Sequence, residues 1–101
     1  MLNINKTTQN GTVIIELEGR LDTASASVFQ AAVDESVGDA GAFIFDFKRL
    51  NYLSSAGLRV LLTTQQLMED TGRPEVTVQG ANAAIKEVFT VTGFVNVLNI
   101  R

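Results

Sequence analysis

Alternation between apolar and polar residues dominates the first part of the chain. Between residues 12 and 18, apolar side chains hold every odd position and glutamates hold the last two even ones, a period of two that is typical of a strand with one buried face. Residues 1–8 alternate more weakly, and the Gln9–Gly11 segment has turn chemistry because Asn and Gly tolerate positive φ. The sequence therefore predicts a hairpin, whose second strand ends where residues 19–23 break the alternation.

Helical spacing begins after this break. Residues 24–37 are expected to form a helix whose first amides are capped by Asp22 or Thr23, with a modest apolar stripe on one side. That predicted stripe consists of Val28, Ala31, Ala32 and Val37. The almost continuous apolar run 42–47 indicates a strand covered on both faces, as central strands of parallel sheets are, and its phenylalanines are assigned to the core.

The second half of the chain repeats this order of elements. Residues 56–70 have helical spacing, residues 75–79 form a short predicted strand, residues 82–92 a third predicted helix, and residues 94–100 return to strand character. A strand, a helix and a further strand in this order make a crossover unit, which packs its helix on one face of the sheet. The predicted fold class is therefore α/β, with a mixed sheet of four or five strands and three or four helices packed on it.

Composition narrows the function more than it narrows the fold. The 101 residues contain no Cys and no His, which excludes disulfides, zinc sites with thiolate or imidazole ligands, cysteine nucleophiles and Ser-His-Asp triads. The acidic residues are scattered and lack calcium-loop spacing. We therefore expect one domain over residues 1–101 that binds a partner and is not an enzyme, with no metal site and no cofactor.

Charge and hydropathy exclude two further classes of partner. The formal net charge is -3 and the 8 Lys and Arg residues are dispersed, whereas nucleic-acid binding needs a concentrated positive stripe. The apolar runs fall far short of the ~20 residues of a membrane-spanning helix, and residues 1–11 are too polar for an export signal. The sequence thus predicts a cytoplasmic protein that inserts into no membrane and binds no nucleic acid.

The segment 50–62 carries the candidate site. It follows the predicted central strand and opens the second helix, at an edge where α/β folds commonly place their sites. The adjacent Ser54 and Ser55 can each act as a helix N-cap, a contribution of ~1 kcal/mol that explains one of them without any function. Gly57 costs up to ~1 kcal/mol relative to Ala inside a helix, which indicates close backbone approach by another part of the chain or by a partner.

The run 52–62, Tyr-Leu-Ser-Ser-Ala-Gly-Leu-Arg-Val-Leu-Leu, resembles the signature of bacterial anti-sigma-factor antagonists of the STAS domain family. Residues 17–22, Leu-Glu-Gly-Arg-Leu-Asp, resemble the second strand of that family and the loop that leaves it. The order of elements matches along essentially the whole chain. The resemblance implies a STAS-like fold, in which a mixed sheet carries helices and a serine at the start of the second helix is a regulatory site.

In that family the serine is phosphorylated by a partner that is both a serine kinase and an anti-sigma factor. Unphosphorylated protein binds the partner and frees the sigma factor, and a serine phosphatase restores the binding form. The match places Ser55 on the phosphorylated serine, with Ser54 as the alternative. Ser54 falls on a position that is often Asp and Ala56 on one that is often Ser or Thr, so the chain departs from the common pattern beside the site.

The resemblance and the spacing together define an expected partner-binding surface. It consists of Asp22, Ser54, Ser55, Ala56, Gly57, Leu58 and Arg59. Asp22 serves equally well as a helix cap, and Arg59 as a solvated surface residue. The alternative function is a constitutive STAS accessory subunit of an ABC-type lipid transport complex, and the expected oligomeric state is a monomer or a weak dimer.

Overall fold

Five strands form one sheet, and their spatial order is the same as their order in the chain. The computed structural model describes residues 1–101. The strands are β1 (Leu2–Gln9), β2 (Thr12–Leu21), β3 (Ala42–Leu53), β4 (Thr77–Gln79) and β5 (Asn99–Ile100). The helices are α1 (Ala26–Ser36), α2 (Ser55–Asp70) and α3 (Ala83–Thr92), followed by the 3-10 helix η1 (Phe94–Asn96). The predicted α/β class and its numbers of strands and helices are confirmed.

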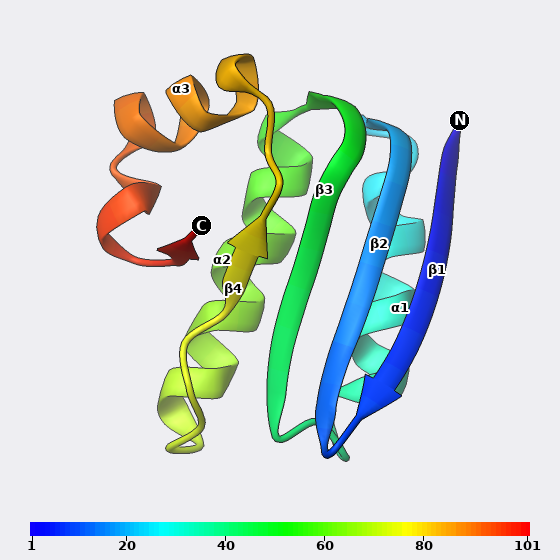
Figure 1. Ribbon diagram of the computed structural model, residues 1–101, viewed down its shortest axis with the longest axis vertical. Coiled ribbons are helices and arrows are strands. Elements are labelled where there is room, and N and C mark those ends of the chain that lie inside the picture. The colour runs from blue at the N-terminus through cyan, green and yellow to red at the C-terminus, as the bar shows by residue number, and fades with distance from the viewer.

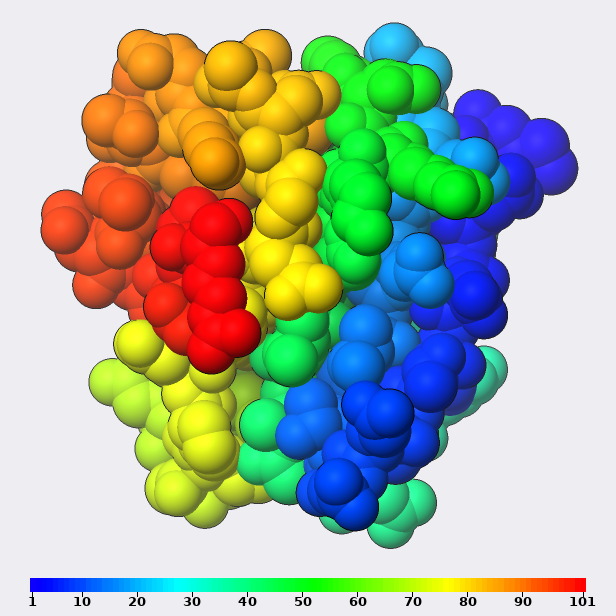
Figure 2. All heavy atoms as spheres, in the orientation of Figure 1, coloured from blue at the N-terminus to red at the C-terminus, as the bar shows by residue number.

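The topology places the helices on one side of the sheet. β1 pairs with β2 in antiparallel fashion, and every later neighbour pair is parallel. The crossovers between parallel strands are right-handed, and the strand order never reverses. Successive helices are therefore placed on the same face of the sheet. Figure 1 shows α1 and α2 behind the sheet, and Figure 2, in the same orientation, shows the face in front, where no helix crosses β1, β2 or β3. No helix reaches the length and apolarity that crossing a bilayer demands.

The first two strands form the predicted hairpin. The turn residues Asn10 and Gly11 have φ of 52° and 83°, as a two-residue type I′ turn requires. β2 is longer than predicted because it continues through Leu21. Gly19 permits this extension: its φ is 107°, and a Cβ there would lie 2.3 Å from the Met1 carbonyl oxygen.

The core lies between the sheet and the two long helices. Phe43, Phe45 and Phe47 of β3 are fully buried, as predicted. The ring of Phe29 from α1 meets Phe45 edge-on at 5.0 Å, and Phe89 from α3 stacks on Phe47 at 6.4 Å. Aromatic pairs at these separations contribute beyond the area that they bury, so phenylalanine contacts fix both α1 and α3 to β3.

The prediction that the strand at 42–47 is covered on both faces is wrong. On the face without helices, Ile44 is only half-buried, although Asp46 on the same strand is buried. The Asp46 carboxylate accepts hydrogen bonds from the Lys48 amide at 2.9 Å and the Gln79 side chain at 3.4 Å. The register between β2 and β3 shifts next to these bonds, and the pairing then continues. β3 therefore ends at Leu53 instead of at residue 47.

The predicted apolar stripe of α1 is wrong in part: Ala32 and Val37 pack against the core, whereas Val28 and Ala31 are exposed. Val28 is 52% exposed, whereas Phe29 and Val33 are buried against the sheet. The helix turns the face with the large phenylalanine inward because burying an aromatic ring removes more apolar area from water than burying alanines does. The stripe that faces the core is Ala26, Phe29, Val33 and Ser36.

The C-terminal strand is much shorter than predicted. The third helix begins after Asn82, whose side chain accepts from the Ile85 amide at 2.9 Å, and it ends at Gly93 in the left-handed conformation. This turn leads directly into η1 rather than into a strand. Only Asn99 and Ile100 of the predicted 94–100 strand pair with β4.

Candidate functional site

The carboxyl ends of β2 and β3 lie side by side and bring the two predicted parts of the site together. Leu21 and Leu53 are register partners, and the Ser54 amide donates to the Leu21 carbonyl at 2.9 Å. Asp22 therefore leaves β2 at the same edge where Ser54 and Ser55 leave β3. Figure 1 shows this edge at the top of the sheet, where α2 begins.

Ser54 is the N-cap of α2. Its backbone is extended, with φ of −89° and ψ of 170°, and its hydroxyl oxygen accepts from the Gly57 amide at 3.2 Å. The side chain is buried, with 9% of the residue exposed. The explanation by helix capping, which the sequence left open for either serine, therefore applies to Ser54.

Ser55 is the first residue of α2, and it is exposed. Because the Ser54 hydroxyl makes the capping bond, the Ser55 hydroxyl is not needed for that purpose. Amides of the first helical turn lack acceptors within the helix and carry the positive end of its dipole. No acidic side chain lies in this turn to neutralise it. Ser55 thus presents a free hydroxyl where negative charge is favoured.

Gly57 holds α2 against the ends of the two strands. A Cβ at this position would lie 2.7 Å from Leu21 Cγ and 2.9 Å from Leu53 Cδ1, closer than carbon atoms pack. The close approach that the sequence indicated is therefore to another part of the chain, not to a partner. The structure places Gly57 in the interior, where it positions the surface above it and is not exposed on it.

Asp22 and Ser25 bond reciprocally and cap the turn that leads into α1. Asp22 Oδ1 accepts from both the Ser25 amide and the Ser25 hydroxyl at 2.9 Å, and Ser25 Oγ in turn accepts from the Asp22 amide at 2.9 Å. The amide bond first, and the hydroxyl bond second, lower the pKa of the Asp22 carboxyl below its usual value. Asp22 thus caps the turn before α1, whereas the N-cap of α1 itself is Ser25, without a side-chain capping bond, so the predicted capping of the helix by Asp22 or Thr23 is wrong. Asp22 is a half-buried anion at the same edge as Ser55.

Arg20 and Tyr52 form a contact that the sequence analysis did not anticipate. The guanidinium carbon of Arg20 lies 4.3 Å from the centroid of the Tyr52 ring, a cation–π geometry. The two residues are register partners on β2 and β3, and both are exposed. The sequence carries no signal for this pair because its alignment depends on the register shifts between the two strands.

The remaining predicted residues divide by exposure. Arg59 is exposed, and Ala56 and Leu58 are half-buried. With the exposed Ser55 and the half-buried Asp22 they form a surface at the start of α2, hereafter the Ser55 surface. Ser54 and Gly57 lie beneath it. The structure thus brings five of the seven predicted residues to the surface and uses the other two to support them.

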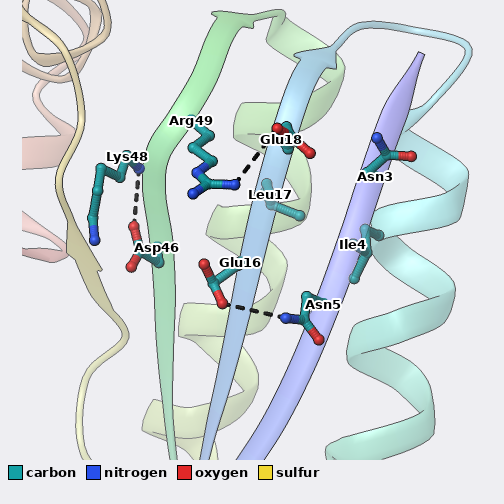
Figure 3. Close-up of a pocket in the computed structure, with 9 residues that line it drawn as sticks. All are labelled: Asn3, Ile4, Asn5, Glu16, Leu17, Glu18, Asp46, Lys48 and Arg49. Carbon is teal, nitrogen blue, oxygen red and sulfur yellow. Dashed lines mark hydrogen bonds and ion pairs between the residues drawn. The ribbon is translucent and has the colours of Figure 1, made fainter.

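A separate shallow hollow of about 140 Å³ lies on the open face of the sheet, away from the Ser55 surface (Figure 3). Its charged side chains are Glu16, Glu18, Asp46, Lys48 and Arg49. Several are already engaged: Arg49 approaches Glu18 at 3.8 Å, and Glu16 accepts from the Asn5 amide group at 3.4 Å. The hollow therefore offers a polar surface with mixed charge, and the sequence analysis did not predict it.

Comparisons with known proteins identify the family. The sequence model of the STAS domain family matches residues 3–101. A Bordetella bronchiseptica protein named "Putative anti-sigma factor antagonist BtrV" is 34% identical over 94 residues, which cover 90% of this chain and 78% of that protein. The anti-sigma-F factor antagonist RsfB of Mycobacterium tuberculosis is 26% identical over 73 residues, or 71% of this chain and 60% of its own length.

Solved structures agree on the fold. SpoIIAA of Bacillus in its phosphorylated form matches with a TM-score of 0.77 at 19% identity, covering 100% of this chain and 91% of that one. The anti-sigma factor antagonist SpoIIAA in its unphosphorylated form matches with a TM-score of 0.78 at 18% identity, covering 100% and 87%. With a family match over nearly all of its residues, the chain belongs to the STAS domain family.

Proposed function

We propose that this protein is an anti-sigma-factor antagonist of the cytoplasm, which binds an anti-sigma factor through the Ser55 surface and is released when Ser55 is phosphorylated. The observation that carries the proposal is the exposed Ser55 hydroxyl at the first position of α2, beside a buried Ser54 that already caps the helix. The names of BtrV and RsfB, proteins to which this chain is similar, support the class of partner.

The switch is a reversible phosphoryl transfer. The partner, acting as a kinase, transfers the terminal phosphoryl group of a nucleoside triphosphate to Ser55 Oγ, while the hydroxyl proton passes to a base of the kinase and the diphosphate leaves. A phosphatase then uses water to break the new P–O bond and releases inorganic phosphate. This chain supplies only the accessible hydroxyl and the surface that the partner recognises.

The fold tolerates the added charge because capping and modification use different hydroxyls. The capping bond from the Gly57 amide, at 3.2 Å, is made to Ser54, so a phosphate added to Ser55 takes none of its atoms. A negative group at the start of a helix is stabilised by ~0.3–1 kcal/mol through the helix dipole and the free amides. SpoIIAA fits this chain equally well in its two forms, with TM-scores of 0.78 and 0.77, which supports a switch without a change of fold.

The partner is repelled because the same charge falls within the contact surface. Leu58 and Ala56 are half-buried and supply apolar area next to Ser55. A phosphoserine carries about −1.5 to −2 charges at neutral pH, and burying that charge in an apolar contact costs free energy. The Asp22 carboxylate at the same edge adds repulsion. A loss of only ~1.4 kcal/mol weakens binding tenfold, so the local effect is large enough for a switch.

Variants of Ser55 test this proposal against the cognate anti-sigma factor. Ser55→Ala is expected to bind as the unmodified protein does and to accept no phosphate from the kinase. Ser55→Asp is expected to bind at least about tenfold more weakly. Gln66→Asp, which adds the same charge at an exposed position later in α2, is the control and should leave affinity unchanged.

Two results would overturn the proposal. One is phosphorylation of the Ser55→Ala variant at another residue together with full binding by Ser55→Asp. The other is recovery of the native protein with components of a lipid transporter and with no anti-sigma factor, which would instead support the accessory-subunit function.

A further inference from the structure

Arg59 is a cation without an internal partner beside the proposed phosphorylation site. It lies four residues after Ser55 on α2, and both side chains are exposed. The two ion pairs of the chain join other residues, Lys6 with Glu35 at 3.4 Å and Arg49 with Glu18 at 3.8 Å. None of the residues three or four positions from Arg59 on α2 is acidic, so no neighbour on its helix face neutralises this guanidinium.

Helix geometry directs Arg59 toward Ser55. Residues four apart on a helix lie on one face with Cβ atoms ~5–6 Å apart, and long side chains lean toward the N-terminus. An anion that precedes a cation by four residues is also the favoured orientation, since each charge then interacts well with the helix dipole. A phosphate on Ser55 would therefore lie within reach of the forked guanidinium, which matches phosphate oxygens.

We propose that Arg59 is the internal counter-ion of phosphorylated Ser55, and that this pairing withdraws Arg59 from an acidic group on the partner. The proposal rests on the proposed function and adds a second cause of release. In the unmodified protein the guanidinium is free to bind a carboxylate of the partner across the Ser55 surface. After phosphorylation the same guanidinium is held within the chain, so the partner loses an attractive contact as well as meeting the new charge.

Arg59 is better placed for this role than the other charged residues at this end of the molecule. Arg20 is engaged with the Tyr52 ring at 4.3 Å. The remaining charged groups here are the Met1 amino group, Asp22 in the turn after β2, and Lys86 and Glu87 on α3. None of these is on α2, and none forms an ion pair with Arg59. Asp22, the anion that follows β2, is bonded to Ser25 at 2.9 Å.

The internal pair is tested without any partner by 31P NMR. Phosphoserine is installed at position 55 during translation, and the second pKa of its phosphate, ordinarily ~6, is measured by titration. Arg59→Gln is expected to raise that pKa by about 0.3 of a pH unit, because the counter-ion that favours the dianion is lost. Lys86→Gln, which removes an exposed cation from α3, should leave it unchanged. Equal pKa values with and without Arg59 would overturn the pair.

Binding to the anti-sigma factor tests the second half of the proposal. Arg59→Gln should weaken binding of the unmodified protein by about twofold to fivefold and leave binding of the phosphorylated protein nearly unchanged. The affinity ratio between the two forms should therefore shrink by that factor. An unchanged ratio contradicts the withdrawal of Arg59. A pKa shift in a protein that binds no anti-sigma factor would instead contradict the proposed function and leave the internal pair standing.

Discussion

At the scale of single residues, the proposed switch gives two neighbouring serines separate tasks. Ser54 is buried and bonds to the Gly57 amide at 3.2 Å, whereas Ser55 is exposed at the next position. Because Ser54 is buried, a phosphate on its hydroxyl would have to displace the residues packed around it, whereas a phosphate on the exposed Ser55 meets solvent. Separating the two tasks lets charge be added to the surface while the helix start stays intact.

This division predicts different stabilities for two alanine variants. Ser54→Ala removes the cap of α2 and should lower the free energy of unfolding by ~1 kcal/mol. Ser55→Ala removes an exposed hydroxyl and should change it by less than about 0.5 kcal/mol. Urea unfolding followed by circular dichroism measures both. Equal losses would show that the capping bond does not matter, or that both serines share it.

Gly57 and Gly38 form a matched pair of glycine variants. A Cβ at Gly57 would meet Leu21 at 2.7 Å and Leu53 at 2.9 Å, while nothing lies within 4 Å of one at Gly38. Overpacking of this kind costs ~1–3 kcal/mol, more than the ~1 kcal/mol that Ala contributes to a helix. Gly57→Ala should therefore reduce stability to urea, and Gly38→Ala should not. A stabilising Gly57→Ala would contradict the packing described here.

The lowered pKa of Asp22 predicts a dependence of stability on pH. The hydrogen bonds from Ser25 favour the ionised Asp22 carboxylate, so its pKa in the folded protein lies below the ordinary value of 3.8 that applies in the unfolded chain. The folded protein therefore binds the carboxyl proton less tightly than the unfolded chain does. Asp22 should therefore contribute stability above that value and lose it progressively as the pH falls below it. Carboxyl titration by NMR measures the pKa directly, and Asp22→Asn should flatten stability in this acid range. A pKa of Asp22 at or above 3.8 would be inconsistent with the capping bonds.

At the scale of elements, Arg73 ties the end of α1 to the segment that follows α2. Its Nη1 donates to the Val37 carbonyl at 2.6 Å and the Ala40 carbonyl at 2.8 Å. These bonds satisfy carbonyls at a helix C-terminus, where a cation is also favoured. They fix the amino ends of β3 and β4 far from the Ser55 surface.

Arg73→Ala should lower the free energy of unfolding by ~1–2 kcal/mol, since two charge-assisted bonds are lost. Arg73→Lys should recover only part of the loss, because an ammonium lacks the guanidinium fork. Neither variant should alter affinity for the anti-sigma factor once corrected for the folded fraction. Arg101→Ala, at the exposed last residue, is the control with no expected effect, and an equal loss there would argue against the tie.

The sequence predicts most elements and misses the parts that tertiary contacts decide. Periodicity locates the hairpin, the second and third helices and the central strand, because each carries a strong local pattern. It predicts only part of the buried face of α1, since only the fold shows that Phe29 and not Val28 meets the sheet. It also ends β3 at 47, because a shift of register stabilised by Asp46 is invisible in a pattern of alternating residues.

The candidate site shows the same limit. Spacing within one segment identifies Ser54, Ser55 and Gly57, yet it cannot say which serine is buried or what the glycine approaches. Those answers come from Leu21 on the neighbouring strand, which pairs with Leu53 and lies beneath Gly57. Contacts between distant segments therefore decide how the tasks are divided.

At the scale of the whole molecule, the sheet has one covered face and no reversal of strand order. Ligand crevices in open α/β sheets form where the order reverses, and the order β1-β2-β3-β4-β5 contains no such point. The carboxyl edge instead consists of turns and the starts of helices, which suits contact with another protein. The architecture and the proposed function are therefore consistent.

Calorimetric titration of the anti-sigma factor with this protein, unmodified and phosphorylated at Ser55, tests the central claim most directly. The unmodified protein is expected to bind, and the phosphorylated protein to bind at least about tenfold more weakly. Equal affinities for a phosphorylated chain that remains fully folded would contradict it.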